Sequence, residues 1–123
     1  MTASYASLIK DTDACASELR NLIPEAFTAF GALSRAAQAE GVLDGRTKEL
    51  LALAISVAIR CDACIAYHAR GALRAGASRQ EVAEALGVAI QMGGGPSVNY
   101  GSHALRAYDE FEKVAKLNAA APA

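Results

Sequence analysis

The sequence predicts a small all-α domain of about six helices, and three observations favour this class. Alanine, the strongest helix former and a weak strand former, accounts for 29 of the 123 residues. Hydrophobic residues make up 53% of the chain, whereas aromatic residues make up only 6%. A core with so few bulky side chains requires closely packed helices. The length fits one domain over residues 1–123, large enough to bury a core without disulfide bonds.

The N-terminal third of the chain carries two helical patterns. Apolar residues predict a first helix over residues 4–20. Pro24 suits the first position of a second helix over residues 24–39, because its missing N–H is not needed there. Three large apolar residues recur at helical spacing in this second segment, namely Phe27, Phe30 and Leu33.

The middle of the chain predicts two further helices separated by a break near residues 60–62. Asp44 is a suitable N-cap for a helix over residues 45–59. Beyond Glu49 this helix is apolar nearly all round, so we expect it to lie buried at the centre of the subunit. The next helix is expected to end at about residue 75, before Gly76.

The C-terminal third predicts the last two helices. Ser78 and Glu81 match a capping box that starts a helix over residues 79–92. The Gly-Gly-Gly-Pro run at residues 93–96 then breaks the pattern, and a final helix covers residues 97–117. We expect the small and polar residues 118–123 to fray.

Charge and motifs exclude several classes of partner. Twelve basic and thirteen acidic residues are interspersed, with a net charge of −1, so no nucleic-acid partner is expected. No apolar run is long enough to span a membrane, and no signal peptide is evident, so we expect a cytoplasmic protein. The glycine run lacks the order and the preceding strand of a phosphate loop, and it predicts a turn without a bound cofactor.

The chemistry of the chain is expected at Cys61, Cys64 and His68. Three cysteines are too few for a secreted disulfide scaffold, and the CxxC spacing indicates redox chemistry or metal binding. At the start of a helix the two cysteine Cα atoms lie about 5 Å apart, within reach of a disulfide. His68, four residues after Cys64, shares its face of the helix. A helix N-terminus and a nearby histidine both favour the reactive thiolate.

Two other interpretations of these residues stay open. The cysteines could be buried structural residues beside a hydrogen-bonded histidine. They could also form part of a zinc site, which needs a fourth ligand from Glu49, Cys15 or His103. Taken alone, however, Cys15 is expected to be a small core residue and His103 a partly exposed helical histidine. Arginines flank the cysteine helix and could steady a thiolate or remain solvated, namely Arg60, Arg70 and Arg74.

Glu49 stands twelve residues before Cys61 at the head of the apolar helix. On one unbroken helix that separation is about 18 Å. Only a chain reversal or a neighbouring subunit could bring Glu49 to the cysteines. An acidic group favoured by the helix N-terminus is the alternative explanation of this residue.

The spacing Glu49, Cys61, Cys64 and His68 resembles the AhpD-like or carboxymuconolactone decarboxylase-like family, and the likeness runs over residues 48–100. The resemblance implies an all-α fold, homo-oligomers such as trimers or hexamers, and a CxxC pair that cycles between dithiol and disulfide. It implies that Glu49 and His68 form a proton relay that activates Cys64, with Cys61 as its partner. Which cysteine meets the peroxide first is left open.

The function implied is a thiol-dependent peroxide reductase, whose partners are a small hydroperoxide and an external thiol–disulfide reductant. No metal or cofactor is expected. The chain departs from the prototype peroxidase of this family at Ala63, where that enzyme has a second histidine just before its second cysteine. Two alternatives from other classes are a lyase of the decarboxylase type without redox cycling, and a non-enzymatic zinc-binding or redox-sensing oligomeric module.

Overall fold

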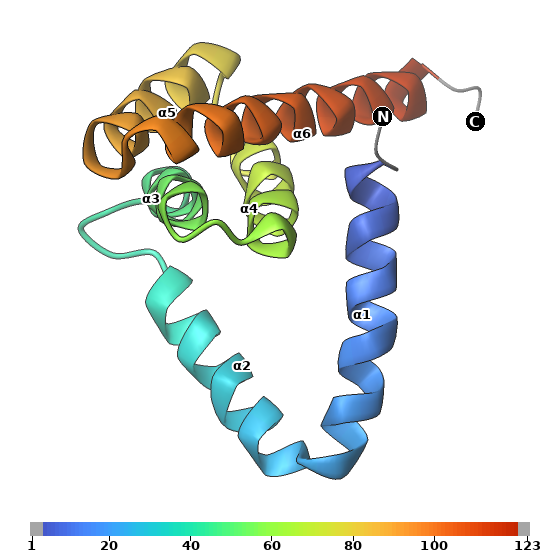
Figure 1. Cartoon of the computed structure of the whole chain (residues 1–123). Helices are drawn as coiled ribbons and strands as arrows, with labels where there is room; N and C mark the ends of the chain where they lie inside the picture. Colours follow the sequence, from blue (N-terminus) through green and yellow to red (C-terminus); the bar gives the residue numbers. More distant parts are fainter. Residues whose placement is uncertain (1–3, 121–123) are drawn as a thin grey trace.

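The computed structural model describes residues 4–120, and this part of the chain forms six α-helices and no strand (Figure 1). The predicted all-α class is therefore confirmed. No helix among these residues is long and apolar enough to cross a membrane. The helices are α1 (Tyr5–Leu22), α2 (Pro24–Gln38), α3 (Gly45–Ala58), α4 (Asp62–Arg74), α5 (Arg79–Gly93) and α6 (Gly95–Ala120).

The two predicted N-terminal caps explain where α3 and α5 begin. The side chain of Asp44 accepts a hydrogen bond from the Thr47 N–H at 2.8 Å, which starts α3. At α5, Ser78 and Glu81 form the complete capping box. Only Gly94 separates α5 from α6, so the glycine run makes a tight turn with a positive φ of 72° at this residue. The last helix continues through residue 120, beyond its expected end, and residues 121–123 of the predicted frayed tail lie outside the described part.

Helices α3 to α6 pack into a bundle that holds most of the core (Figure 1). The largest fully buried apolar side chains are Leu53, Ile65, Val57 and Val82. Alanines line much of the remaining interior and let the helix axes approach closely; they are Ala66, Ala69, Ala72, Ala77, Ala89, Ala104 and Ala107. The composition therefore predicted the character of the core correctly.

The expectation that the helix over residues 45–59 lies buried at the centre of the subunit is correct for one face and wrong for the other. Helix α3 packs against α4, α5 and α6 with one face, which buries Leu53, Ser56 and Val57. No helix among residues 4–120 covers its opposite face, where Ile55 is 58% exposed and Ile59 is 64% exposed. The apolar residues of α3 thus lie on two faces, of which one is packed against the bundle and the other is exposed.

Helices α1 and α2 form a V-shaped arm that projects from the bundle (Figure 1). Only Tyr5 and Ile9, near the start of α1, are buried, and no residue of α2 is buried. Phe30 is 67% exposed and Leu33 is 63% exposed, so the apolar residues predicted for the second helix have little cover within the chain. A surface helix of this kind normally buries its apolar stripe against another element.

A tight reversal joins α3 to α4 and determines which residues of the two helices meet. The N–H of Arg60 bonds to the carbonyl of Val57 at 3.1 Å, and the N–H of Cys61 bonds to the carbonyl of Ser56 at 3.0 Å. These two bonds form a Schellman motif, with Arg60 in the left-handed conformation at φ 59°. The motif ends α3 and sends the chain back along it, so that α4 starts immediately at Asp62.

Candidate functional site

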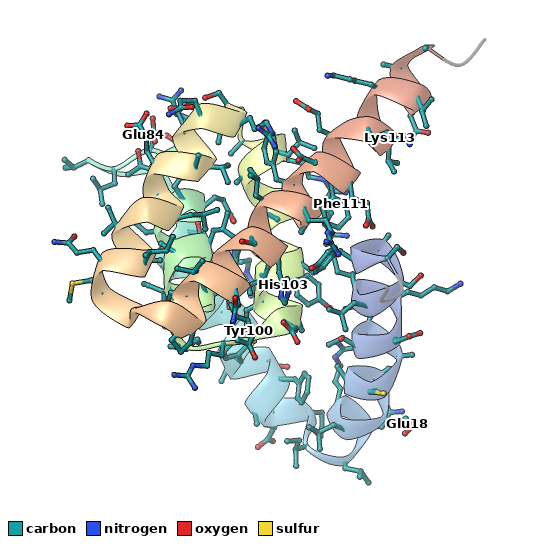
Figure 2. The ribbon with its side chains drawn as sticks, turned by 45° about the horizontal axis from the view of Figure 1, so that its top comes forward. Glu18, Glu84, Tyr100, His103, Phe111 and Lys113 are labelled. Atoms are coloured by element: carbon teal, nitrogen blue, oxygen red, sulfur yellow. A yellow bond between two sulfur atoms is a disulfide. The ribbon has the colours of Figure 1, made fainter. Side chains whose placement is uncertain are left out.

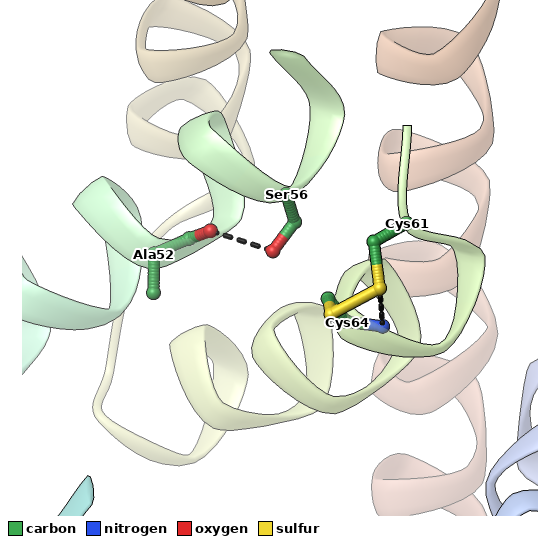
Figure 3. The surroundings of a disulfide bond; sticks show 4 residues. All are labelled: Ala52, Ser56, Cys61 and Cys64. Carbon is green, nitrogen blue, oxygen red and sulfur yellow. Dashed lines mark hydrogen bonds between the residues drawn. A yellow bond between two sulfur atoms is a disulfide. The ribbon is translucent and has the colours of Figure 1, made fainter. Parts of the chain in front are cut away.

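The two cysteines of the CxxC motif open helix α4 and form a disulfide bond (Figure 3). Cys61 is the N-cap residue with extended backbone angles, and Cys64 lies in the first turn. Their Cα atoms are 5.2 Å apart, which agrees with the expected distance of about 5 Å for this spacing. Both residues are partly exposed to solvent.

The N-terminus of α4 provides a polar contact to the first sulfur. The backbone N–H of Cys64 donates a hydrogen bond to the Sγ of Cys61 at 3.2 Å (Figure 3). This sulfur therefore occupies the place of an N-cap oxygen, where the helix dipole favours negative charge. Figure 3 also shows Ser56 of the neighbouring helix α3, whose hydroxyl donates a hydrogen bond to the carbonyl of Ala52 at 2.6 Å within its own helix.

Glu49 and His68 meet across the packed helices α3 and α4. The Oε2 atom of Glu49 lies 2.9 Å from Nδ1 of His68, and the side chains are 20% and 32% exposed. Since an ionised carboxylate can only accept, Nδ1 carries the hydrogen and donates it. In the neutral ring Nε2 is then unprotonated and can accept a proton.

The chain reversal brings Glu49 into this site within one subunit. From the sequence, either a chain reversal or a neighbouring subunit could bring Glu49 to the helix that carries the cysteines. The structure shows the chain reversal. His68 lies four residues after Cys64, a spacing at which Cβ atoms on a helix are about 5–6 Å apart. The carboxylate of Glu49 on α3 thus contacts the imidazole of His68, which follows Cys64 by about one turn of α4, and such an order can move a proton from a thiol to the ring.

A second set of contacts links the cysteine helix to the arm and had no signal in the sequence. The hydroxyl of Tyr67 donates a hydrogen bond to a carboxylate oxygen of Asp13, on α1. Burial, with the hydrogen bond to Asp13, raises the pKa of Tyr67, so the phenol stays neutral. The guanidinium of Arg70 lies 5.7 Å from the centre of the Tyr67 ring. Because Tyr67 and Asp13 are 54 residues apart in sequence, their spacing could not reveal this contact.

Several other candidates lie away from the cysteines. Cys15 is exposed, so its predicted place in the core is wrong, because α1 packs on the bundle only near its N-terminal end. His103 is exposed on α6, with its ring 5.7 Å from that of Tyr100 (Figure 2). Arg60 and Arg74 are also exposed. Within residues 4–120, no three histidine, cysteine or acidic side chains converge as a metal site would require.

Residues 24–107 match the carboxymuconolactone decarboxylase family, a span that includes the two cysteines, Glu49 and His68. Among curated sequences, an uncharacterized protein from Cupriavidus necator is 43% identical over 86 residues, which cover 70% of this chain and 76% of that protein. Protein 4 of the cox locus of Paracoccus denitrificans is 40% identical over 84 residues, which cover 68% of this chain and 76% of that protein.

Two solved structures resemble this chain closely. A carboxymuconolactone decarboxylase family protein from Legionella pneumophila, solved in its apo form, superposes with a TM-score of 0.84 at 41% identity, covering 87% of this chain and 96% of that one. A family member from Thermotoga maritima, described with a possible involvement in antioxidative response, gives a TM-score of 0.69 at 36% identity, covering 73% of this chain and 93% of that one.

Proposed function

Because the chain belongs to the carboxymuconolactone decarboxylase family, and because the helix that carries its CxxC pair also carries a histidine held by Glu49 of α3, we propose that it is a thiol-dependent hydroperoxide reductase. The observation that carries this proposal is the 2.9 Å contact between Glu49 and His68, one helical turn from Cys64. A structural disulfide has no need of an oriented general base beside it.

The first step activates a thiol. Nε2 of His68 takes the proton of the Cys64 thiol, and the carboxylate of Glu49 stabilises the imidazolium through Nδ1. The Cys64 thiolate then attacks the terminal oxygen of the hydroperoxide and breaks the O–O bond. Sulfur gains that oxygen as a sulfenic acid, and the leaving alkoxide takes a proton from His68 to become an alcohol.

The second step resolves the sulfenic acid. The thiol of Cys61 attacks the Cys64 sulfur, a disulfide forms, and the hydroxyl leaves as water. In total one hydroperoxide and two thiols give one alcohol, one water and one disulfide. The Cα distance of 5.2 Å in the Cys61–Cys64 disulfide lies within the ordinary range for such bonds.

An external dithiol must return the protein to its reduced state. The partly exposed cysteine pair allows a thiolate of the reductant to attack one sulfur and form a mixed disulfide, which a second thiol then releases. We accordingly propose the reducing cytoplasm as its compartment, since thiol reductants regenerate the pair there. Ala63 stands where the prototype peroxidase has a second histidine, so His68 is the one histidine in the proposed relay with Glu49.

The exposed apolar face of the arm supports self-association. Phe30 and Leu33 lie on a helix with no buried residue, and isolated helices of about 15 residues are only marginally stable in water. We propose that further copies of this chain cover the arm, in a homo-oligomer such as a trimer or hexamer.

Steady-state turnover tests the proposed activity. Reduced protein is mixed with an organic hydroperoxide and a dithiol, and loss of hydroperoxide is followed against a sample alkylated at its cysteines. The proposal predicts that the reduced protein consumes hydroperoxide catalytically and that alkylation of the cysteines abolishes this consumption. Activity on a lactone substrate that survives alkylation, with no hydroperoxide loss, would instead identify a lyase.

A further inference from the structure

Gly71 lies directly against the carboxyl group of Glu49. A Cβ added to Gly71 would be 2.6 Å from Cδ and 3.0 Å from Oε1 of Glu49, and it would come still closer to Oε2. Real Cβ atoms essentially never approach other atoms within 3.0 Å. The carboxyl group therefore fills the volume that any other side chain at position 71 would take.

The place of this glycine in the helix relates it to His68. Residues three apart on a helix lie on the same face, one turn from each other, so Gly71 follows His68 along the side that faces α3. The carboxyl group of Glu49 thus lies against the Cα atom of Gly71, and its Oε2 atom reaches Nδ1 of His68, one turn earlier in the helix.

We propose that Gly71 is a positioning residue for the proton relay: its missing side chain makes the space in which the Glu49 carboxylate orients His68. This inference rests on the proposed function for its catalytic consequence, although the contact itself does not. Helix α4 needs no glycine at this position for a turn, because residue 71 lies inside the helix and has no positive φ. Glycine inside a helix is less favourable than alanine, and the close contact with Glu49 distinguishes Gly71 from a mid-helix glycine such as Gly87, whose Cβ would meet nothing within 4 Å.

Replacing Gly71 by alanine should displace Glu49 and leave the fold intact. The atoms that the new methyl group meets are the far end of a flexible side chain, which can swing toward solvent because Glu49 is 20% exposed. The backbones of α3 and α4 can therefore stay in place, while the contact with Nδ1 of His68 is lost.

The first test observes the contact itself by nitrogen-15 NMR of the histidine rings in reduced protein. The native chain should show a His68 ring with its hydrogen on Nδ1, since the hydrogen bond of one ring nitrogen sets the tautomer. Gly71→Ala should shift this ring toward the Nε2-protonated form, and Glu49→Ala should do the same. Gly87→Ala is the matched control, because a Cβ at Gly87 of α5 meets nothing within 4 Å. An unchanged His68 spectrum in Gly71→Ala would overturn the inference.

The second test is a double-mutant cycle on the rate of thiol loss with an organic hydroperoxide. Gly71→Ala should lower the rate by at least about tenfold, toward that of Glu49→Ala, within the range expected of an acid–base group. In the Glu49→Ala background the same change should have no further effect, because nothing remains for the methyl group to displace. Equal rate losses in both backgrounds would mean that Gly71 acts through general packing and would refute the positioning role.

The two tests separate failure of this inference from failure of the proposed function. If the native protein does not react with hydroperoxide, the reductase proposal fails, and the NMR comparison still decides whether Gly71 positions Glu49. If the native protein reacts and the Gly71→Ala spectrum and rate are native, only the inference about Gly71 fails.

Discussion

The Nδ1 atom of His68 lies 2.9 Å from the Oε2 atom of Glu49, although the two residues are 19 positions apart and belong to different helices. The Schellman motif between α3 and α4 creates this proximity by turning the chain back immediately after residue 59. It joins a carboxylate on an apolar helix to the helix that carries both cysteines. The chemistry proposed here depends on that contact.

The two cysteines should have distinct roles. In Cys61→Ser, the Cys64 thiolate should still react once with hydroperoxide and stop as a sulfenic acid, because no resolving thiol remains. In Cys64→Ser, that reaction should be lost. Both variants should have no turnover. The variant Cys15→Ser should turn over hydroperoxide at the native rate, since Cys15 is exposed on the arm. Mass spectrometry after trapping with a sulfenic-acid reagent measures these outcomes, and turnover in either CxxC variant would contradict the assignment.

Removing either member of the relay should slow the thiol reaction. Glu49→Gln and His68→Ala are each expected to lower the rate of hydroperoxide-dependent thiol loss by roughly 10²–10⁴. Stopped-flow measurement under single-turnover conditions isolates this step from reduction by the external dithiol. The chain contains one other histidine, so His103→Ala on the exposed side of α6 is the matched control and should react at the native rate. Native rates in both relay variants would exclude general acid–base catalysis by this pair.

Helix caps should make the protein sensitive to acid. Hydrogen bonds from Thr47 lower the pKa of Asp44 below its ordinary 3.8, and the Ser78 N–H lowers the pKa of Glu81 below its ordinary 4.5. The folded state thus prefers the charged forms, so their stabilisation is present above these ordinary values and is lost as pH falls through the lower folded pKa values.

The double variant Asp44→Asn and Glu81→Gln tests this account of acid sensitivity. Asparagine and glutamine keep a capping side chain but cannot titrate. The melting temperature of the native protein should fall more steeply below pH 4.5 than that of the double variant. Circular dichroism melts at several pH values measure both slopes, and identical slopes would show that the two carboxylates do not contribute.

The arm should mediate self-association. Phe30→Glu with Leu33→Glu places two charges on the apolar residues of α2 that the chain leaves 67% and 63% exposed. The native protein should scatter light as a multiple of its 12.7 kDa mass at micromolar concentration, and the double variant should shift toward the monomer with unchanged helix content. A native protein that is monomeric under these conditions would contradict the proposal.

The sequence predicted the helices well because their signals are local. Asp44 and the Ser78–Glu81 pair act within one turn of the residues that they cap, and the glycine run ends a helix through its own backbone. The apolar character of α3 was equally visible, but its burial was not. Which of its faces meets another helix depends on the packing of the whole chain, and an apolar residue that stays exposed has the same sequence pattern as one in the core.

The site was predictable only in part for the same reason. The positions of Cys61, Cys64 and His68 relative to one another follow from one helix. The role of Glu49 in the site was predicted from the family resemblance, because its spacing alone was equally consistent with an ordinary acidic residue near a helix N-terminus. The exposure of Cys15 depends on how far α1 extends beyond the bundle. The contact of Gly71 with Glu49 depends on the distance between α3 and α4, and an isolated glycine within a helical pattern was its only signal.

The most direct test of the redox proposal is a thiol count with intact mass on reduced, metal-free protein, before and after one equivalent of an organic hydroperoxide. The account predicts rapid loss of two thiols and two hydrogens, located at Cys61 and Cys64 by peptide mapping and reversed by a dithiol. Cys15 should stay reduced. Retention of all three thiols, or slow oxidation without preference among them, would contradict the account.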